Sequence, residues 1–119
     1  MNHVIISGML GRDPRTGVTA SGTVWANASV AVQKYRQKDK TYETHWIKVV
    51  AWSRSADILS TFVKGELVII EGELSTSEYE KDGKKQYSTE VMAHSVIKGV
   101  KLERLTQNQD QAQEGVGAP

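Results

Sequence analysis

The chain contains no cysteine and only two prolines among its 119 residues. Without cysteine there are no disulfides, no cysteine-ligated zinc and no thiol nucleophile. Long apolar runs are missing too, because Ser7 and Gly8 interrupt the run Val4–Leu10, and no positively charged leader precedes it. This pattern fits neither a signal peptide nor a membrane span, so we expect a cytoplasmic protein.

Positive charge is concentrated in the body of the chain. Up to Leu105, fifteen Lys and Arg face twelve Asp and Glu, a net charge of +3, whereas the last fourteen residues hold only Asp110 and Glu114. A polyanionic partner is compatible with this excess, although solvated surface charge explains it more simply. Composition and length predict one domain over residues 1–105 and a disordered tail over 106–119, where almost nothing apolar is available for burial.

Apolar and polar residues alternate along most of the chain, which is the periodicity of β-strands. Five strands are predicted, over residues 3–10, 23–35, 43–52, 66–80 and 86–96. Pro14 ends the first, because proline cannot continue a ladder, and the pair Asp82-Gly83 indicates a hairpin between the last two. Residues 11–22 and 36–42 are interpreted as polar and charged loops.

One segment, residues 53–65, changes to a helical period. Ala56, Leu59, Phe62 and Val63 share one helical face, a serine can cap the start, and Gly65 stands where a helix stops. A helix of two to three turns between strands three and four is typical of the OB-fold, an all-β five-stranded Greek-key barrel. Other small barrels lack that helix, so the element order predicts an OB-fold.

Catalytic and metal-binding motifs are not evident. His3, His45 and His94 fall on three different predicted strands without metal-ligand spacing, and no serine or carboxylate forms a nucleophile motif with them. Gly8 and Gly11 are followed by another strand and not by the helix that a phosphate loop requires. We therefore expect no enzyme activity, no metal and no cofactor.

The placement of aromatic residues is more informative. Alternation in the third strand puts Trp46 and Trp52 opposite the small apolar residues that would fill the barrel. The same parity places three further rings outside: Trp25, Tyr35 and Tyr79. Such rings can stack on unpaired bases, at roughly 1–3 kcal/mol per base and with little regard to sequence. Alternatively, Trp25 packs against the helix or another subunit, and the tyrosines only pack their hairpins.

Cations are needed beside the rings to bind the phosphates of a strand. The sequence supplies them in the loop after the second strand, around the tryptophan pair and on the last hairpin: Lys34, Arg36, Lys38, Lys40, Lys48, Arg54, Lys81, Lys84 and Lys85. Each alone is an ordinary solvated side chain, and only their clustering favours nucleic acid. Stacking does not distinguish DNA from RNA, so an RNA-binding OB module stays open as an alternative.

A succession of short motifs runs through residues 2 to 100. They are Asn2, Gly8-x-Leu10-Gly11-x-Asp13-Pro14, Gly22, Val24-x-Ala26-Asn27, Thr44-x-Trp46, Ala56-Asp57, Lys64-Gly65 and Val68-x-Ile70-Glu71-Gly72-x-Leu74. In this succession the chain resembles the bacterial-type single-stranded DNA-binding proteins. The resemblance implies an OB-fold assembled as a homotetramer, which wraps single-stranded DNA over its aromatic faces during replication, recombination and repair. A protein-binding module of the primosome type is the remaining alternative.

The resemblance also implies roles for individual residues. Tyr35, Trp46, Trp52 and Tyr79 match positions where the family has stacking Trp, Trp, Phe and Trp, and Arg54 and Lys64 match basic positions. Two features depart from the family pattern. Ser75, Ser77 and Glu78 stand where basic residues are common, so fewer phosphate contacts are expected there. The last five residues of the sequence, Gly115–Pro119, lack the acidic and aromatic tip through which the family recruits replication and repair proteins.

Overall fold

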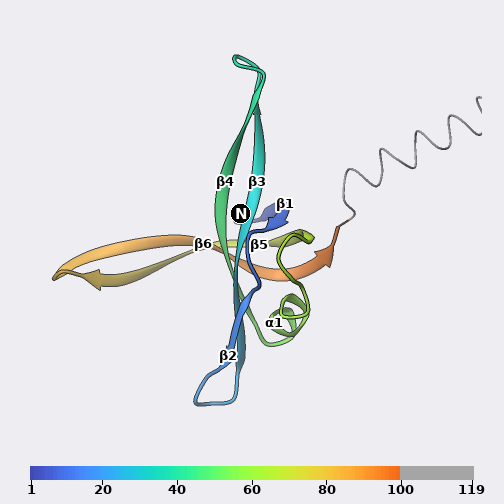
Figure 1. Cartoon of the computed structure of the whole chain (residues 1–119). Helices are drawn as coiled ribbons and strands as arrows, with labels where there is room; N and C mark the ends of the chain where they lie inside the picture. Colours follow the sequence, from blue (N-terminus) through green and yellow to red (C-terminus); the bar gives the residue numbers. More distant parts are fainter. Residues whose placement is uncertain (100–119) are drawn as a thin grey trace, which may run out of the picture.

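The computed structural model describes residues 1–99, so the predicted tail over 106–119 lies outside the described residues. The elements follow one another as β1 (Val4–Leu10), β2 (Arg15–Val18), β3 (Val24–Arg36), β4 (Thr41–Trp52), α1 (Ser53–Leu59), β5 (Leu67–Lys81) and β6 (Lys84–Lys98). Hairpins of β3–β4, β5–β6 and β2–β3 project in three directions from a small central body (Figure 1).

The sheet closes into a barrel. Its strand order is β1-β5-β6-β4-β3-β2, and an additional pairing of β1 with β3 joins the two sides. Five strands therefore form the closed barrel, and β2 is added outside it along β3. The β4–β6 pairing is parallel, at Val49–Val91 and Val50–Met92. With α1 between β4 and β5, this is an OB-fold, which confirms the predicted fold class.

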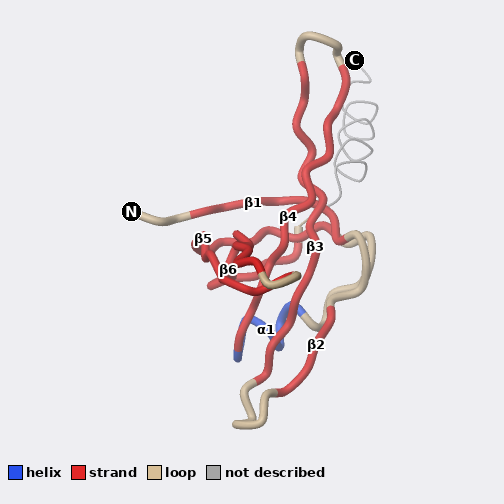
Figure 2. Tube along the Cα trace, turned by 90° about the vertical axis from the view of Figure 1, so that its left-hand side faces the viewer, coloured by secondary structure: helices blue, strands red, loops and turns tan. Residues whose placement is uncertain are grey.

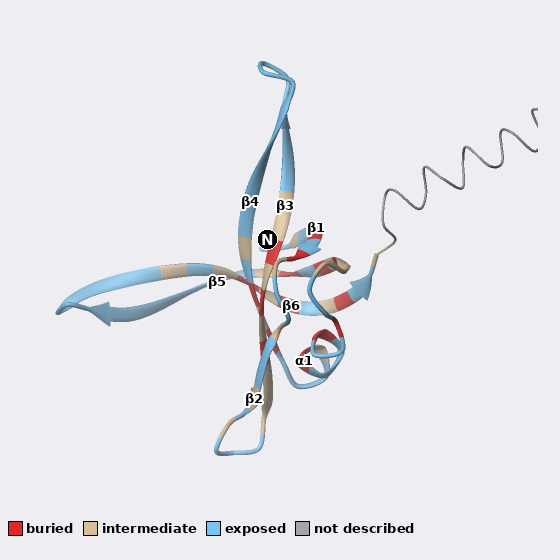
Figure 3. Ribbon diagram, in the orientation of Figure 1, coloured by how far each residue is buried: buried red, intermediate tan, exposed pale blue. Residues whose placement is uncertain are grey.

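The core lies where the strands cross (Figure 3). Small inward-facing residues of β3 and β4 fill it together with residues of β1, β5, β6 and the helix: Leu10, Ala26, Ala28, Val30, Val49, Ala51, Ala56, Leu59, Phe62, Val68, Ile70, Val91, Ala93 and Val96. The predicted inner faces of the second and third strands are thus confirmed. Leu74 was expected on the core face but is exposed, because β5 leaves the barrel there and continues as a free hairpin with β6 (Figure 1).

The helix is shorter than expected. It ends at Leu59, and its N-cap is Trp52, without any side-chain hydrogen bond, so the predicted serine cap is wrong. The hydroxyls of Ser60 and Thr61 each donate a hydrogen bond of 2.7 Å to a carbonyl three residues earlier, which satisfies the final turn and ends it. Val63 therefore falls beyond the helix and is exposed instead of buried.

Residues 11–22 are not a single loop, as the sequence had indicated. Arg15–Val18 forms β2, an edge strand of four residues that pairs with β3 in the register Arg15–Asn27 and Gly17–Trp25. The charged loop predicted over 36–42 is also shorter, because β3 runs to Arg36 and β4 begins at Thr41. The first correction adds a strand along the edge of β3, and the second lengthens the β3–β4 hairpin.

Candidate nucleic-acid interface

The outer face of β3 and β4 carries paired aromatic residues. The antiparallel register sets Trp25 opposite Trp52, Ala31 opposite Trp46 and Tyr35 opposite Tyr42. Since directly opposed residues lie on the same face of a sheet, these side chains share the outer surface. The sequence predicted that both tryptophans of β4, together with Trp25 and Tyr35, lie on the outer face, and the structure confirms this position.

The same face continues across β6 and β5. Val50 on the outer face of β4 lies beside Met92 of β6, and two-residue steps from Met92 along β6 lead to Gln86, which pairs with Tyr79 of β5. Tyr79 thus belongs to the surface that holds Trp46 and Trp52. We call this continuous outer surface of β3, β4, β6 and β5 the aromatic face.

The rings differ in accessibility. Trp46 is 61% exposed and Trp52 is 43% exposed, while Tyr35 and Tyr79 are each 48% exposed. Trp25 is only partly accessible. Several exposed rings on one face can be covered by a ligand with flat apolar surfaces. Binding is then favourable because it removes the apolar surface of the rings from water.

Two of the indole rings pack directly against glycines. A Cβ on Gly17 would stand 2.5 Å from Cζ2 of Trp25, and a Cβ on Gly11 would overlap the six-membered ring of Trp46. The rings therefore lie against bare backbone, Trp25 on β2 and Trp46 on the end of β1. Trp25 packs on β2, a contact that the sequence did not reveal.

Tyr42 belongs to the aromatic face and was missed. Its ring centroid lies 5.1 Å from that of Tyr35, with the ring planes inclined at 53°. The sequence pattern predicts a strand only from Glu43, which places Tyr42 in the preceding loop, whereas β4 begins at Thr41. Extending the same alternation back from Trp46 through Thr44 would have found it.

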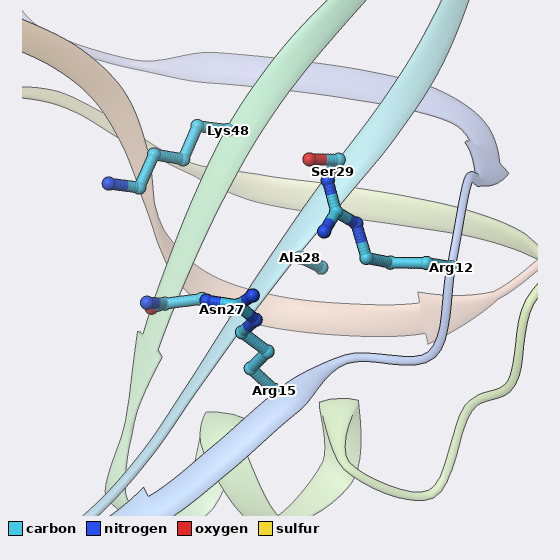
Figure 4. A pocket seen from close by; sticks show the side chains of 6 residues that line it. All are labelled: Arg12, Arg15, Asn27, Ala28, Ser29 and Lys48. Atoms are coloured by element: carbon cyan, nitrogen blue, oxygen red, sulfur yellow. The ribbon is translucent and has the colours of Figure 1, made fainter.

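A basic hollow lies in the middle of the aromatic face, between Trp46 and the Trp25–Trp52 pair. It has a volume of about 280 Å³ and is lined by Arg12, Arg15, Asn27, Ala28, Ser29 and Lys48 (Figure 4). A second hollow of about 310 Å³ adjoins it, sharing Arg12 and Ser29 and reaching Gly11 and Trp46. The sequence pointed to Lys48 but missed both arginines, since their positions depend on β2.

The predicted cations of the first hairpin are divided between its two faces. Lys48 lies on the aromatic face, where its Nζ is 3.2 Å from a carboxylate oxygen of Glu90. Lys34 and Arg36 have the opposite parity to Tyr35 and lie on the back of the hairpin, where Arg36 is 3.9 Å from Asp39. Lys38 and Lys40 are in the connecting turn. The structure therefore brings only one of these five cations close to the indoles.

The remaining predicted cations lie at the edges. Arg54 is exposed on α1, two residues after Trp52, and Lys64 follows the helix, with its backbone N–H donating to Asp13. Lys81 and Lys84 flank the tip of the β5–β6 hairpin, and Lys85 lies 3.6 Å from Glu78. Ser75 and Ser77 do face outward on β5, as expected, but Glu78 faces the other side, opposite Tyr87.

The three histidines are separated, each beside a glutamate: His3 and Glu71 at 3.0 Å, His45 and Glu43 at 3.5 Å, and His94 and Glu73 at 3.6 Å. Among residues 1–99, no three metal-ligating side chains come together. No helix within the same span is long and apolar enough to cross a membrane.

Comparisons with known proteins agree with this geometry. The single-stranded DNA-binding protein 2 of Streptococcus agalactiae serotype V is 40% identical over 96 residues, which cover 79% of this chain and 73% of the relative. The single-stranded DNA-binding protein of Clostridium tetani is 37% identical over 99 residues, covering 81% and 68%. That of Treponema pallidum is 32% identical, and only 56% of its length is covered. Residues 1–98 match the single-strand binding protein family, and the chain belongs to that family.

Proposed function

We propose that this chain binds single-stranded DNA without strong sequence preference and coats exposed strands during replication, recombination and repair. The aromatic face carries the proposal: partly exposed rings from β3, β4 and β5 share one continuous surface with a basic hollow. The relatives named above are single-stranded DNA-binding proteins, and a member of this family acts as a binding protein and not as an enzyme.

Stacking and charge have separate tasks in this mechanism. Trp46, Trp52 and Tyr35 offer π-surfaces to unpaired bases, each stacked base contributing roughly 1–3 kcal/mol. Cations beside them neutralise phosphates, and release of their counterions makes affinity fall as salt rises. Duplex DNA keeps its bases stacked on one another, so its π-surfaces are not offered to the rings. The mechanism thus favours single strands of any sequence.

Which rings stack is part of the proposal. Trp46 and Trp52 are assigned first, because they are exposed on the central strand of the aromatic face. Tyr35 and Tyr79 extend the path onto the two hairpins. Trp25 presents a smaller surface, being seated on Gly17, and contributes an edge beside Trp52. Of the predicted phosphate ligands, Lys48 lies between Trp46 and Trp52 on β4, and Arg54 follows Trp52 by two residues.

We further propose that the chain assembles as a homotetramer. Ile5 and Met9 of β1 and Ile97 of β6 are 63%, 49% and 54% exposed on the outer side of the barrel, and apolar surface of this kind commonly marks a protein interface. The edge of β1 is also open over Val4–Gly8, because β1 pairs with β3 only at Met9 and Leu10. Figure 2 shows β1 leading away from the body at its N-terminal end.

The test is a titration of tryptophan fluorescence with oligo-dT, a ribo-oligomer of equal length and a duplex. We expect strong quenching by oligo-dT, little by duplex, and affinity that falls with salt. Absence of quenching by oligo-dT at low salt would refute the proposal. Equal or tighter binding of the ribo-oligomer would favour an RNA-binding module instead, and failure of all three nucleic acids would favour a protein-binding module.

Sedimentation equilibrium tests the assembly. A homotetramer is expected, and Ile5→Asp should lower the oligomeric state because it places a charge on the exposed apolar side of β1. A monomeric wild-type chain at micromolar concentration would overturn this part alone. The site of action that follows from the proposal is the cytoplasm, on the cell's DNA.

A further inference from the structure

We propose that Arg12 and Arg15 form a seat for one backbone phosphodiester, placed between the two groups of stacking rings. The inference rests on the proposed function and adds to it a specific anion subsite. The seat is the basic hollow at the centre of the aromatic face, which Arg12 and Arg15 enter from the chain segment 11–17 (Figure 4).

Segment 11–17 is tied to β3 at both ends. The N–H of Gly11 donates to the carbonyl of Ser29 at 3.1 Å, and Arg15 lies opposite Asn27 in the β2–β3 ladder. Arg12 and Arg15 therefore start from fixed backbone positions next to these two polar residues. Figure 4 shows Arg12 reaching toward Ser29 and Arg15 toward Asn27.

The two arginines are not neutralised within the described part of the chain. Neither guanidinium lies within 4.0 Å of a carboxylate among residues 1–99, whereas Lys48, on the same hollow, is 3.2 Å from Glu90. In Figure 4, the Lys48 side chain extends away from both arginines. Two unpaired like charges that line one hollow repel each other, and an anion between them removes that repulsion.

The chemistry of the hollow fits a phosphodiester. A guanidinium presents N–H donors in a planar fork that matches two phosphate oxygens. The Asn27 amide and the Ser29 hydroxyl add neutral donors, which are common ligands of the DNA backbone. No base edge is required for any of these contacts, so the seat is indifferent to sequence.

Its position gives the seat a role in the path of the strand. The indole next to Arg12 is Trp46, which rests on Gly11, and the indole next to Arg15 is Trp25, which rests on Gly17. Trp52 lies opposite Trp25 on β4, about 20 Å along the strand from Trp46. A phosphate held midway keeps the strand against the sheet between two stacked bases.

The experiment compares Arg12→Gln, Arg15→Gln and the double variant with the wild type in oligo-dT binding over a range of salt concentrations. For single strands, each lost phosphate contact lowers the slope of log affinity against log salt by about 0.7, so the double variant, which loses the single seated phosphate, should lose about 0.7. Affinity should fall by the same factor for oligo-dT and oligo-dC, while tryptophan quenching at saturation stays as in the wild type.

Lys98→Gln is the matched control, because Lys98 carries the same charge but is paired with Glu66 at 2.9 Å at the end of β6. It should leave the slope unchanged. The proposal is overturned if the double variant changes the slope no more than this control, with wild-type binding intact. Failure of the wild type itself to bind oligo-dT would instead refute the proposed function.

An oligomer of abasic deoxyribose phosphate separates the seat from stacking. The wild type and Trp46→Ala should bind it with equal weak affinity, and the double arginine variant should lose that binding. Titration with inorganic phosphate tests whether the hollow binds a free anion. If phosphate protects the arginine N–H signals in NMR titration but the double variant keeps the wild-type oligo-dT slope, the hollow holds free anions and not the strand, which also overturns the proposal.

Discussion

The ring centroids of Tyr35 and Tyr42 lie 5.1 Å apart on neighbouring strands, with their planes inclined at 53°. A tilted aromatic pair of this kind contributes about 0.5–1.5 kcal/mol beyond the burial of its surface. Tyr42 is 70% exposed and Tyr35 is 48% exposed, so each ring supports the other while both keep an open surface. This pair defines the outer end of the aromatic face.

Tyr42→Ala should weaken oligo-dT binding although the sequence had not singled out this residue. The substitution removes one stacking surface and the support of Tyr35, so we expect a loss of about 1–3 kcal/mol, the range for one stacked base. Fluorescence titration measures the loss. Tyr42→Phe keeps the ring and should bind like the wild type, and a Tyr42→Ala variant with wild-type affinity would remove Tyr42 from the interface.

Trp46→Ala and Trp52→Ala should each reduce the affinity for oligo-dT by about 1–3 kcal/mol, with folding unaffected. Both indoles are substantially exposed, so truncation leaves no cavity in the core. Titration by anisotropy of a labelled oligomer measures binding, and circular dichroism checks the fold. If Trp52→Ala unfolds the chain, Trp52 belongs to the packing of the barrel and not to the interface.

The sequence predicted the central part of the aromatic face because β3 and β4 alternate regularly. Ala26 and Ala28 in one strand, and Val49 and Ala51 in the other, identify the buried parity, and the exposed parity follows from the geometry of a pleated strand. The final hairpin was equally predictable from Asp82-Gly83. Regular periodicity and turn chemistry were therefore sufficient for the barrel and for most of its outer rings.

The basic hollow could not be predicted in the same way. The four residues of β2, Arg15–Val18, show no clean alternation and include Gly17, and their strand conformation comes from pairing with β3. Only that register brings Arg15 beside Asn27. Arg12 depends likewise on the hydrogen bond that ties Gly11 to Ser29. Tertiary pairing, which is invisible to local propensity, placed both arginines.

Gly17→Ala should displace the Trp25 ring. The new Cβ would stand 2.5 Å from Cζ2 of the indole, so the ring must tilt away from β2. Overpacking of this kind costs about 1–3 kcal/mol of the free energy of unfolding, and the freed indole should emit at longer wavelength. Thr16→Ala, at an exposed position on the same strand, is the control and should change neither the free energy of unfolding nor the emission wavelength. An unshifted emission spectrum of Gly17→Ala would contradict the packing of Trp25 against Gly17.

Leu59→Ala and Val63→Ala should differ sharply in stability. Leu59 is fully buried in the core, so its truncation should lower the free energy of unfolding by about 2–5 kcal/mol. Val63 lies past the end of the helix with about half its surface exposed, and its truncation should change stability by less than about 0.5 kcal/mol. Urea denaturation measures both. Similar losses of stability in the two variants would mean that Val63 is buried on a longer helix, as the sequence predicts.

Glu90→Gln should strengthen oligo-dT binding. Glu90 is the carboxylate that holds Lys48 at 3.2 Å on the aromatic face, and its side chain is only 13% exposed. Replacing it removes a negative charge beside the proposed path and leaves Lys48 free for a phosphate, so the slope of log affinity against log salt should steepen by about 0.7.

Glu71→Gln is the control for Glu90→Gln. It removes the same charge from the outer side of β5 at its β1 end, where Glu71 lies opposite Ile5 and pairs with His3 at 3.0 Å. Salt titrations of both variants separate a local effect from the change in net charge. If the salt slope steepens equally in the two variants, the Glu90 ion pair does not prevent Lys48 from binding a phosphate. If it steepens in Glu90→Gln alone, this ion pair limits the number of phosphates that the aromatic face can bind.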